Sequence, residues 1–419
     1  MQTYDQAGAV IEATNPAIAP DGSFSAAGAT DRGTRSSRVS SEWFSRPDDE
    51  RFLSLDDLHA HTKKCADESF AVNVDVRGIR VDASPENPDR MTFEIPTAGN
   101  HSPHFAPESG VITQPNHWSF GQVCSIVQVP SGYMRKLPAA IAAINVQYAL
   151  ANFRQELVKA YVRENGRTEL RACTGPAYGR IYDHEVVNAV RRIAGNGTGD
   201  THWKVPGVMD WSTMRYNPHV DITKETTTLF ASDRDCFMFL VDDTHPIEIG
   251  KLPNGDPDLV FRGFYAWNSE TGSKTFGLAA FYLRGVCQNR CLWGIEGFRE
   301  VTFRHSSGAP SRFAHEIRPA LESFANGRTD RLMLGVQAAK TQRIATDDDG
   351  AREWLGRNKF TQPEISRILK THMEEEGRPV RSVWDVVQGI TAAARGIKHT
   401  DERIDMEKRA GRILDKVKP

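Results

Sequence analysis

The sequence predicts an α+β fold, with a central antiparallel sheet, flanking helices and a C-terminal helical segment. Two apolar runs, Leu259–Trp267 and Phe276–Val286, are rich in aromatic and β-branched residues and are separated by a polar turn that contains Gly272. This pattern is typical of a β-hairpin, and bulky residues on both faces of the first run favour a central, covered hairpin. After His305 the apolar residues recur at helical spacing, and this separation of strands from helices along the chain favours the α+β class.

The N-terminal forty residues differ in composition from the rest of the chain. Residues 1–40 are rich in Ala, Gly, Ser and Thr, and they carry too little apolar surface to offset the entropy of ordering, so we expect a disordered segment. Residues 41–345 are expected to form an α+β core domain, and residues 346–419 a C-terminal helical region. Ser54, with Asp57 three residues later, is expected to cap a helix that runs to about Ala66.

The next part of the core is expected to alternate between strands and helices. Apolar alternation predicts strands near Ala71–Val81 and Met91–Ile95 and a strand at Leu170–Thr174. A helix is expected at Trp118–Val129. A longer helix is expected from Pro138 to Glu164, packed on one face of the central sheet. Its apolar stripe contains Ile141, Ile144, Tyr148, Leu157 and Tyr161. A further helix is expected to begin with Asp183 as its cap and to end at Gly195, and a short buried strand is expected at Cys236–Val241.

The C-terminal region carries the clearest helix signals. Thr361 and Glu364 fit a capping box, in which the two residues satisfy backbone groups at the start of a helix. We expect three helices between about Thr361 and Val417, two of them joined through Gly396–Thr400. Trp384 adjoins an apolar stripe and is therefore expected to be buried.

Composition narrows the functional classes. The chain has 419 residues and a formal net charge of −2, so a nucleic-acid surface would have to come from local clustering of basic residues. No apolar run approaches the length of a membrane span, and no secretory signal is visible. The six cysteines are scattered, which indicates reduced thiols and a cytoplasmic location. We expect no cofactor and no membrane contact, and a protein partner or homo-oligomer stays open.

The hairpin and its flanks carry a family resemblance. The Asn268-Ser-x-x-Gly272 turn, Cys287-x-Asn289 after the second strand, and Arg304-His305 resemble the phage- and plasmid-borne family catalogued as domain of unknown function 932. Further matches cover roughly residues 41–417: Trp43, Arg46-Pro47, Glu50-Arg51-Phe52, Leu55, Leu58, Val383–Val387 and Thr391. The family usually has Gly where this chain has Arg290. The resemblance implies a mobile genetic element more than it implies an activity.

Three groups of residues could carry catalysis or bind a metal. Cys287 and Cys291 could supply two zinc ligands, but no second pair at such spacing lies nearby, so packing thiols are favoured and we predict no metal site. Cys287 could act as a nucleophile only if a base such as His305 lay close. Asp242 and Asp243 follow a buried strand and could bind Mg²⁺, although a solvated loop is the simpler interpretation. The catalytic residues, if there are any, stay unassigned.

Arginine usage points to nucleic acid. Between Thr275 and Ala339 the chain has eight arginines and no lysine, interleaved with aromatic residues. Guanidinium groups bind phosphate bidentately and stack on bases, and basic groups among aromatics on a sheet are typical of single-strand binders. The alternative is a coding bias toward arginine together with ordinary ion pairs. The candidate nucleic-acid-binding residues are Arg284, Arg290, Arg299, Arg304, His305 and Arg312.

Three functions follow from these patterns. The first is a nucleic-acid-binding protein of phage or plasmid DNA metabolism, such as an accessory in recombination or annealing. The second is a metal-dependent enzyme acting on nucleic acid or nucleotides. The third is a host-defence antagonist that acts through protein–protein binding. Strand geometry also predicts that His305 returns to the turn beside Asn268 and Gly272, while Asn289 lies about one strand length away, so these four residues do not form one cluster.

Overall fold

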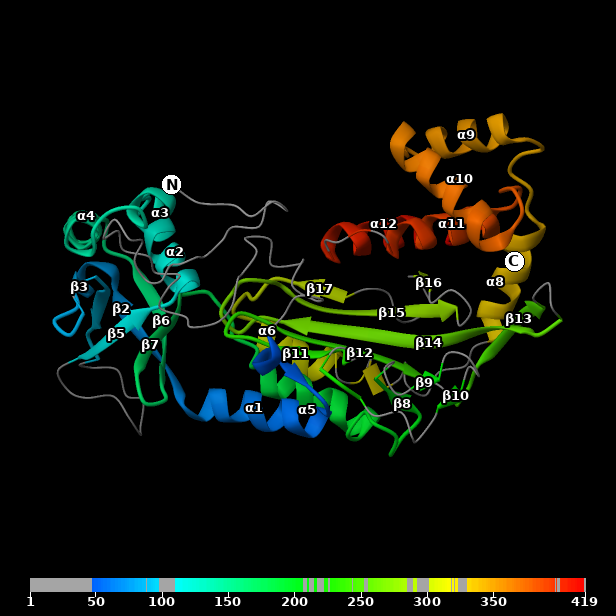
Figure 1. Ribbon diagram of the computed structural model, residues 1–419. Helices are drawn as coiled ribbons and strands as arrows, with labels where there is room; N and C mark the ends of the chain where they lie inside the picture. Colours follow the sequence, from blue (N-terminus) through cyan, green and yellow to red (C-terminus); the bar gives the residue numbers. More distant parts are fainter. Residues whose placement is uncertain are drawn as a thin grey trace.

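The structure is a computed structural model that describes residues 47–87, 89–97, 110–205, 209–210, 215–216, 222–224, 227–242, 244–251, 255–284, 289–291, 301–317, 319, 321–322, 330–395, 397 and 400–417. Its described residues form two main antiparallel sheets, a smaller and a larger one, with helices on their faces and a helical C-terminal part (Figure 1). The predicted α+β class, including the C-terminal helical segment, is confirmed.

The smaller sheet has six strands in the order β2-β6-β7-β5-β4-β3, and only β5 and β7 run parallel. One α-helical layer packs on it, with its own apolar core (Figure 1). The strands are β2 (Ser69–Asp75), β3 (Arg80–Ala83), β4 (Met91–Ile95), β5 (Val111–Pro115), β6 (Leu157–Glu164) and β7 (Thr168–Thr174). The helices are α2 (His117–Ile126), α3 (Ser131–Met134) and α4 (Ala139–Ala151).

The long helix predicted from Pro138 to Glu164 is wrong. The helix α4 ends at Ala151, and the remainder of the predicted range includes strand β6. The predicted stripe also faces outward on α4, where Ile144 and Tyr148 are 69% and 71% exposed. The buried side of α4 consists mainly of small residues that allow a close approach to the smaller sheet, namely Ala139, Ala142, Ala143, Val146 and Leu150. The helix therefore covers the smaller sheet and not the central hairpin.

The larger sheet contains the predicted hairpin. Its path is β1-β11-β12-β14-β15-β16, and β8, β13 and β17 pair beside it. The hairpin strands β14 and β15 are central, and the buried strand predicted before them is β12, so these predictions are confirmed. The strands are β1 (Arg51–Phe52), β8 (Trp203–Lys204), β11 (Leu229–Ala231), β12 (Cys236–Asp242), β13 (Ile247–Lys251), β14 (Pro257–Asn268), β15 (Phe276–Arg284), β16 (Asn289–Cys291) and β17 (Val301–Phe303). A separate pair consists of β9 (Met209–Asp210) and β10 (Arg215–Tyr216).

Helices α1 (Leu55–Asp67) and α5 (Asp183–Ala194) cover one face of the larger sheet (Figure 1). The Ser54 hydroxyl accepts a hydrogen bond from the Asp57 backbone N–H at 3.0 Å, which confirms the predicted cap. The short helix α6 (Ala309–Arg312) and the helical turn at Phe313–Ile317 add apolar side chains to the same core. The other face carries an aromatic cluster that includes Phe237, Tyr265 and Trp267.

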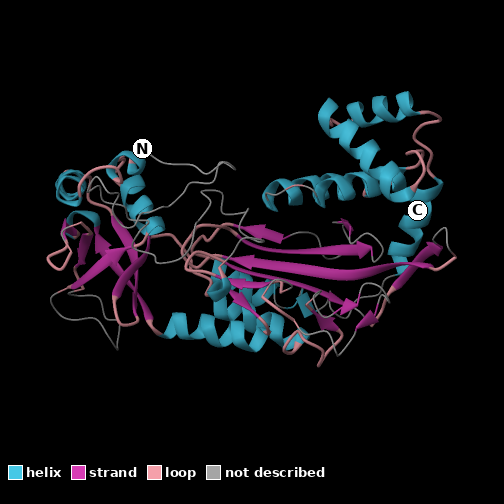
Figure 2. Cartoon of the chain, viewed as in Figure 1, coloured by secondary structure: helices cyan, strands magenta, loops and turns pink. Residues whose placement is uncertain are grey.

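The C-terminal helices pack together beside one end of the larger sheet (Figure 2). They are α8 (Asp330–Thr341), α9 (Asp348–Arg357), α10 (Gln362–Glu376), α11 (Val383–Arg395) and α12 (Thr400–Leu414). The three helices predicted after Thr361 are therefore confirmed, and Glu364 accepts hydrogen bonds from both the backbone N–H and the hydroxyl of Thr361. None of the described helices combines the length and apolar character needed to cross a membrane.

Trp384 supplies a stability test of this helical core. Its side chain is 5% exposed, as the sequence predicts, and it packs with residues of α8, α10 and α12. We expect Trp384→Ala to lower the free energy of unfolding by about 3 kcal/mol, because a large buried side chain leaves a cavity. The measurement is urea unfolding followed by circular dichroism, with Leu334→Ala as the control because Leu334 is 60% exposed. An unchanged Trp384→Ala variant would contradict the burial of this side chain.

Candidate functional site

The turn between β14 and β15 is buried between the two sheets. Residues Asn268–Thr271 are at most 2% exposed, whereas connecting turns normally lie at the surface. The side chains of Trp118 and Gln122 on α2 donate hydrogen bonds to the Thr271 carbonyl at 3.0 Å and 2.9 Å. Gly272 has a φ of +86°, a conformation that favours glycine, so it shapes the turn that the sequence predicts. The hairpin tip therefore docks directly on the smaller sheet and its helix.

The carboxylate of Glu270 is the centre of this contact. Arg171 of β7 lies 2.5 Å from Glu270 Oε1, and the two side chains are 3% and 2% exposed. The backbone N–H of Asp183 donates to the other Glu270 oxygen at 3.3 Å, and the Arg180 guanidinium donates to the Glu270 carbonyl. Removal of either partner from a buried ion pair leaves an uncompensated charge, so the Arg171–Glu270 pair favours this particular docking of the two sheets over others.

Asn268 and Asp183 extend the buried network to helix α5. The Asn268 amide donates to Asp183 Oδ1 at 2.7 Å and to the Ile181 carbonyl at 2.8 Å. Burial, and then the negative charge of Glu270, raise the pKa of Asp183 well above its ordinary value. Asn268 thus ties the turn to the start of α5, and Tyr182, not the predicted Asp183, is the residue that caps this helix.

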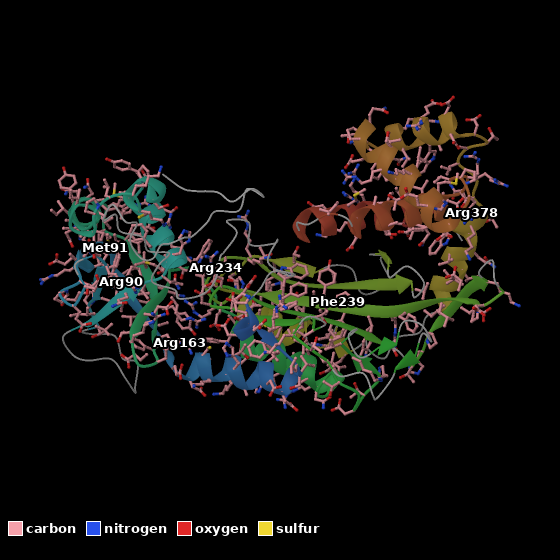
Figure 3. All side chains as sticks on the ribbon, viewed as in Figure 1. Arg90, Met91, Arg163, Arg234, Phe239 and Arg378 are labelled. Atoms are coloured by element: carbon pink, nitrogen blue, oxygen red, sulfur yellow. The ribbon has the colours of Figure 1, made fainter. Side chains whose placement is uncertain are left out.

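The carbonyl of Arg234 anchors the polar side of the turn. Figure 3 shows Arg234 between the smaller and larger sheets. Its backbone oxygen accepts hydrogen bonds from the hydroxyls of Ser269, Thr271 and Ser273 at 2.5, 3.1 and 2.9 Å. Three short hydroxyl side chains at alternate positions thus converge on one acceptor, which explains the Ser and Thr composition of the turn.

His305 lies beside the turn, as strand geometry predicts. Strand β17 pairs with β15 so that Phe303 lies opposite Phe276, whereas Asn289 lies opposite Arg284 at the other end. The His305 ring is buried and stacks on Tyr178 with ring centroids 5.0 Å apart, and its Nδ1 lies 3.1 Å from the Gly179 carbonyl. Burial lowers the pKa of His305 to about 4, so the ring is neutral at neutral pH and Nδ1–H donates.

Gly179 allows this close docking of two backbone segments. Its N–H donates to the His305 carbonyl at 3.0 Å. A Cβ atom at this position would lie 2.0 Å from the Ser306 carbonyl oxygen, so a larger residue could not fit without movement of the backbone. A glycine is required here by steric approach, and this requirement is invisible in the sequence.

The predicted phosphate-binding residues fall at two ends of β15. At the turn end Arg304 is exposed and adjoins His305, and the Arg312 guanidinium lies 4.6 Å from the centroid of the Phe303 ring. The backbones of Arg284 and Arg290 lie at the opposite end, about 26 Å away along β15 at the usual strand rise. Their side chains, and the whole of Arg299, lie outside the described residues.

The carboxylate of Asp242 is already paired with other groups of the protein. Its side chain is fully buried, and Oδ2 lies 2.6 Å from Nη2 of Arg262. Oδ1 accepts the backbone N–H groups of Thr244 and His245 at 3.1 Å and 3.3 Å. Burial acts to raise the pKa of Asp242, but the hydrogen bond and charge of Arg262 hold it below its ordinary value. A bound Mg²⁺ would have to compete with Arg262, and Asp243 lies outside the described residues.

The remaining metal and thiol candidates give no site in the described part of the chain. The described residues contain no group of three or more His, Cys, Asp or Glu side chains that could hold a metal. Cys65, Cys124, Cys173 and Cys236 are buried cysteines. Cys287 and the Cys291 side chain, on which the zinc and nucleophile alternatives depend, lie outside the described residues.

Comparisons with known proteins add no assignment: no family model, curated protein or solved structure matches the chain. The family resemblance therefore stays a prediction. Sequence reasoning missed the Arg171–Glu270 pair, because an acidic residue in a polar turn normally indicates a solvated loop. The available signal was Arg171, a charged residue inside the otherwise apolar run Leu170–Cys173.

Asp183 provides a pH test of the buried turn. Because its folded pKa is raised, the folded state binds more protons than the unfolded state, and stability falls as the pH rises above the ordinary value of 3.8. Asp183→Asn removes this titration while keeping an oxygen that can accept from Asn268. We therefore expect the variant to lose less free energy of unfolding than the wild type between about pH 5 and pH 8.

Urea unfolding at the two pH values measures this difference. Asp57→Asn is the matched control, because Asp57 is an exposed aspartate in the first turn of another helix. If the wild type and Asp183→Asn lose the same free energy of unfolding between the two pH values, Asp183 does not titrate differently in the folded and unfolded states.

Proposed function

We propose that this chain is a nucleic-acid-binding protein of phage or plasmid DNA metabolism, such as an accessory in annealing or recombination. The observation that carries the proposal is the pair of exposed arginines at the turn end of β15. Arg304 and Arg312 lie in the chain on either side of a short turn, and Arg312 stacks over Phe303. The family resemblance supports the genetic setting, and the arginine chemistry supports the ligand.

The backbone around Arg304 is firmly held. Phe303 packs in the core of the larger sheet, and the next residue, His305, is buried and hydrogen bonded to Gly179. Arg304 is exposed between these two anchors. Its side chain is thus presented from a fixed backbone, which lowers the entropy cost of holding a phosphate.

Arg312 remains able to bind a phosphate despite its ion pair. Its Nε lies 3.2 Å from Glu316, and the two side chains are 47% and 56% exposed. An exposed ion pair of this kind contributes little to stability, so a phosphate can compete for the guanidinium. The Phe303 ring meanwhile packs against one face of the Arg312 guanidinium, and the guanidinium nitrogens remain available to hydrogen bond with a phosphate.

The salt dependence of binding tests this proposal. We expect Arg304→Ala with Arg312→Ala to weaken binding of single-stranded DNA. The slope of log affinity against log salt concentration should fall by about 1 to 2, because binding with fewer phosphate contacts releases fewer counterions. The melting temperature should stay nearly unchanged because both side chains are exposed. Arg290→Ala with Arg304→Ala should have a similar effect if the ligand follows β15.

The control is Arg352→Ala with Arg367→Ala, which removes the same charge from exposed positions on α9 and α10. Fluorescence anisotropy across a salt series measures all three double variants. An equal salt slope in the Arg304/Arg312 variant and the control would show that this surface does not contact nucleic acid. Early melting of the Arg304/Arg312 variant would instead make the two arginines structural.

A further inference from the structure

Two histidines that are far apart in the sequence meet at the end of the larger sheet opposite the turn. Strand β8 pairs with β12 so that Trp203 lies opposite Asp242. The residue before Trp203 is His202, and His245 follows Asp242 by three positions. Their ring centroids are 5.5 Å apart and the rings are nearly perpendicular, at 82°. The sheet register thus brings the two imidazoles together.

A buried carboxylate fixes one of these rings. His245 Nδ1 lies 3.2 Å from both oxygens of Asp242, which is itself held by Arg262. The Arg262 guanidinium in turn lies 5.2 Å from the centroid of the buried Trp203 ring. The side chain of His245 is 62% exposed, so the nitrogen left for proton exchange with a ligand is Nε2. An exposed imidazole oriented through Nδ1 by a buried carboxylate is an arrangement that general acid–base catalysis uses.

The two imidazoles occupy different environments. Burial lowers the pKa of His202, the charge of Asp242 opposes this effect, and the positive charges of His245, Arg262 and Lys204 lower it further. His202 is therefore neutral at neutral pH and can accept a proton. His245 instead has the Asp242 carboxylate at hydrogen-bond distance from its Nδ1. The pair thus places a partly buried imidazole beside an exposed one that a carboxylate orients.

We propose that His202 and His245 form a general base and general acid that cleave the phosphodiester backbone of RNA. His202 accepts the proton of a ribose 2′-hydroxyl as its oxygen bonds to phosphorus. The bond from phosphorus to the 5′-oxygen breaks, and that oxygen takes a proton from Nε2 of His245. The products are a 2′,3′-cyclic phosphate and a 5′-hydroxyl, and proton exchange with water restores both imidazoles. The nucleophile comes from the substrate, so the reaction needs no other reactant.

This inference rests on the proposed function in one respect, since the substrate is a nucleic acid. The two sites are separate, because β12 runs antiparallel to β14 and carries Asp242 at the end away from Asn268. Strand β12 has seven residues, so Asp242 is about 20 Å from the turn end. Binding at Arg304 and Arg312 can therefore fail without affecting the histidine pair.

The test is cleavage of a fluorescent oligoribonucleotide by the full chain in the presence of EDTA. We expect a 5′-hydroxyl and a 2′,3′-cyclic phosphate by mass spectrometry, and a bell-shaped pH profile. His202→Gln and His245→Gln should each lower the rate by roughly 100-fold or more. His245→Gln should fold normally because its side chain is largely exposed. His59→Gln is the matched control, since His59 and His184 form another ring pair, 6.4 Å apart, and should leave the rate unchanged.

Each outcome decides the proposal. No cleavage by the wild type overturns it, and so does equal cleavage by the wild type and His245→Gln, which would indicate a contaminating nuclease. Cleavage of an all-DNA strand, or of a strand with a 2′-deoxyribose at the scissile position, excludes attack by the 2′-hydroxyl. Binding that keeps its dependence on Arg304 and Arg312 without cleavage removes only the histidine assignment. Cleavage without that dependence removes only the arginine interface.

Discussion

The buried ion pair between Arg171 and Glu270 is the interaction on which the two-sheet arrangement depends. Its partners belong to different sheets, and each is almost completely buried. A buried pair of this kind gains little net stability over an apolar contact, but a mismatched docking would leave a charge unpaired. The pair therefore acts mainly through specificity: it fixes where the hairpin tip sits on the smaller sheet. Asp183, Asn268 and Arg180 then complete the hydrogen bonds around it.

The long strands of the larger sheet place the two proposed sites at opposite ends of the sheet. At the turn end β15 and β17 bring Arg304 and His305 beside the buried network. At the other end β8 and β12 bring His202 to His245 and Asp242. Because the strands between them are packed on both faces, neither end can move toward the other. A nucleic acid that contacts both ends would have to follow the sheet.

Some sequence patterns carry enough information to predict an element of the structure, and others do not. The hairpin, the Ser54 cap and the C-terminal helices were predictable because local rules and burial favour the same element there. The range Pro138–Glu164 failed because its apolar spacing fits two structures. Val158, Ala160 and Val162 alternate as a buried strand, while the outward Ile144 and Tyr148 of α4 imitate a core stripe. The spacing of apolar residues does not by itself show which face of a helix is buried.

The sequence by itself determined the α+β class, the hairpin with its Gly272 turn, and the arginine-rich character of the chain after Thr275. Strand geometry was also enough to predict that His305 lies beside the turn. Only the tertiary structure decided that the turn is buried, that Glu270 faces Arg171, and that His202 lies beside His245. The physical reason is that local patterns depend on residues a few positions apart. Arg171 and Glu270 are 99 positions apart, and their contact depends on how two separately formed sheets dock.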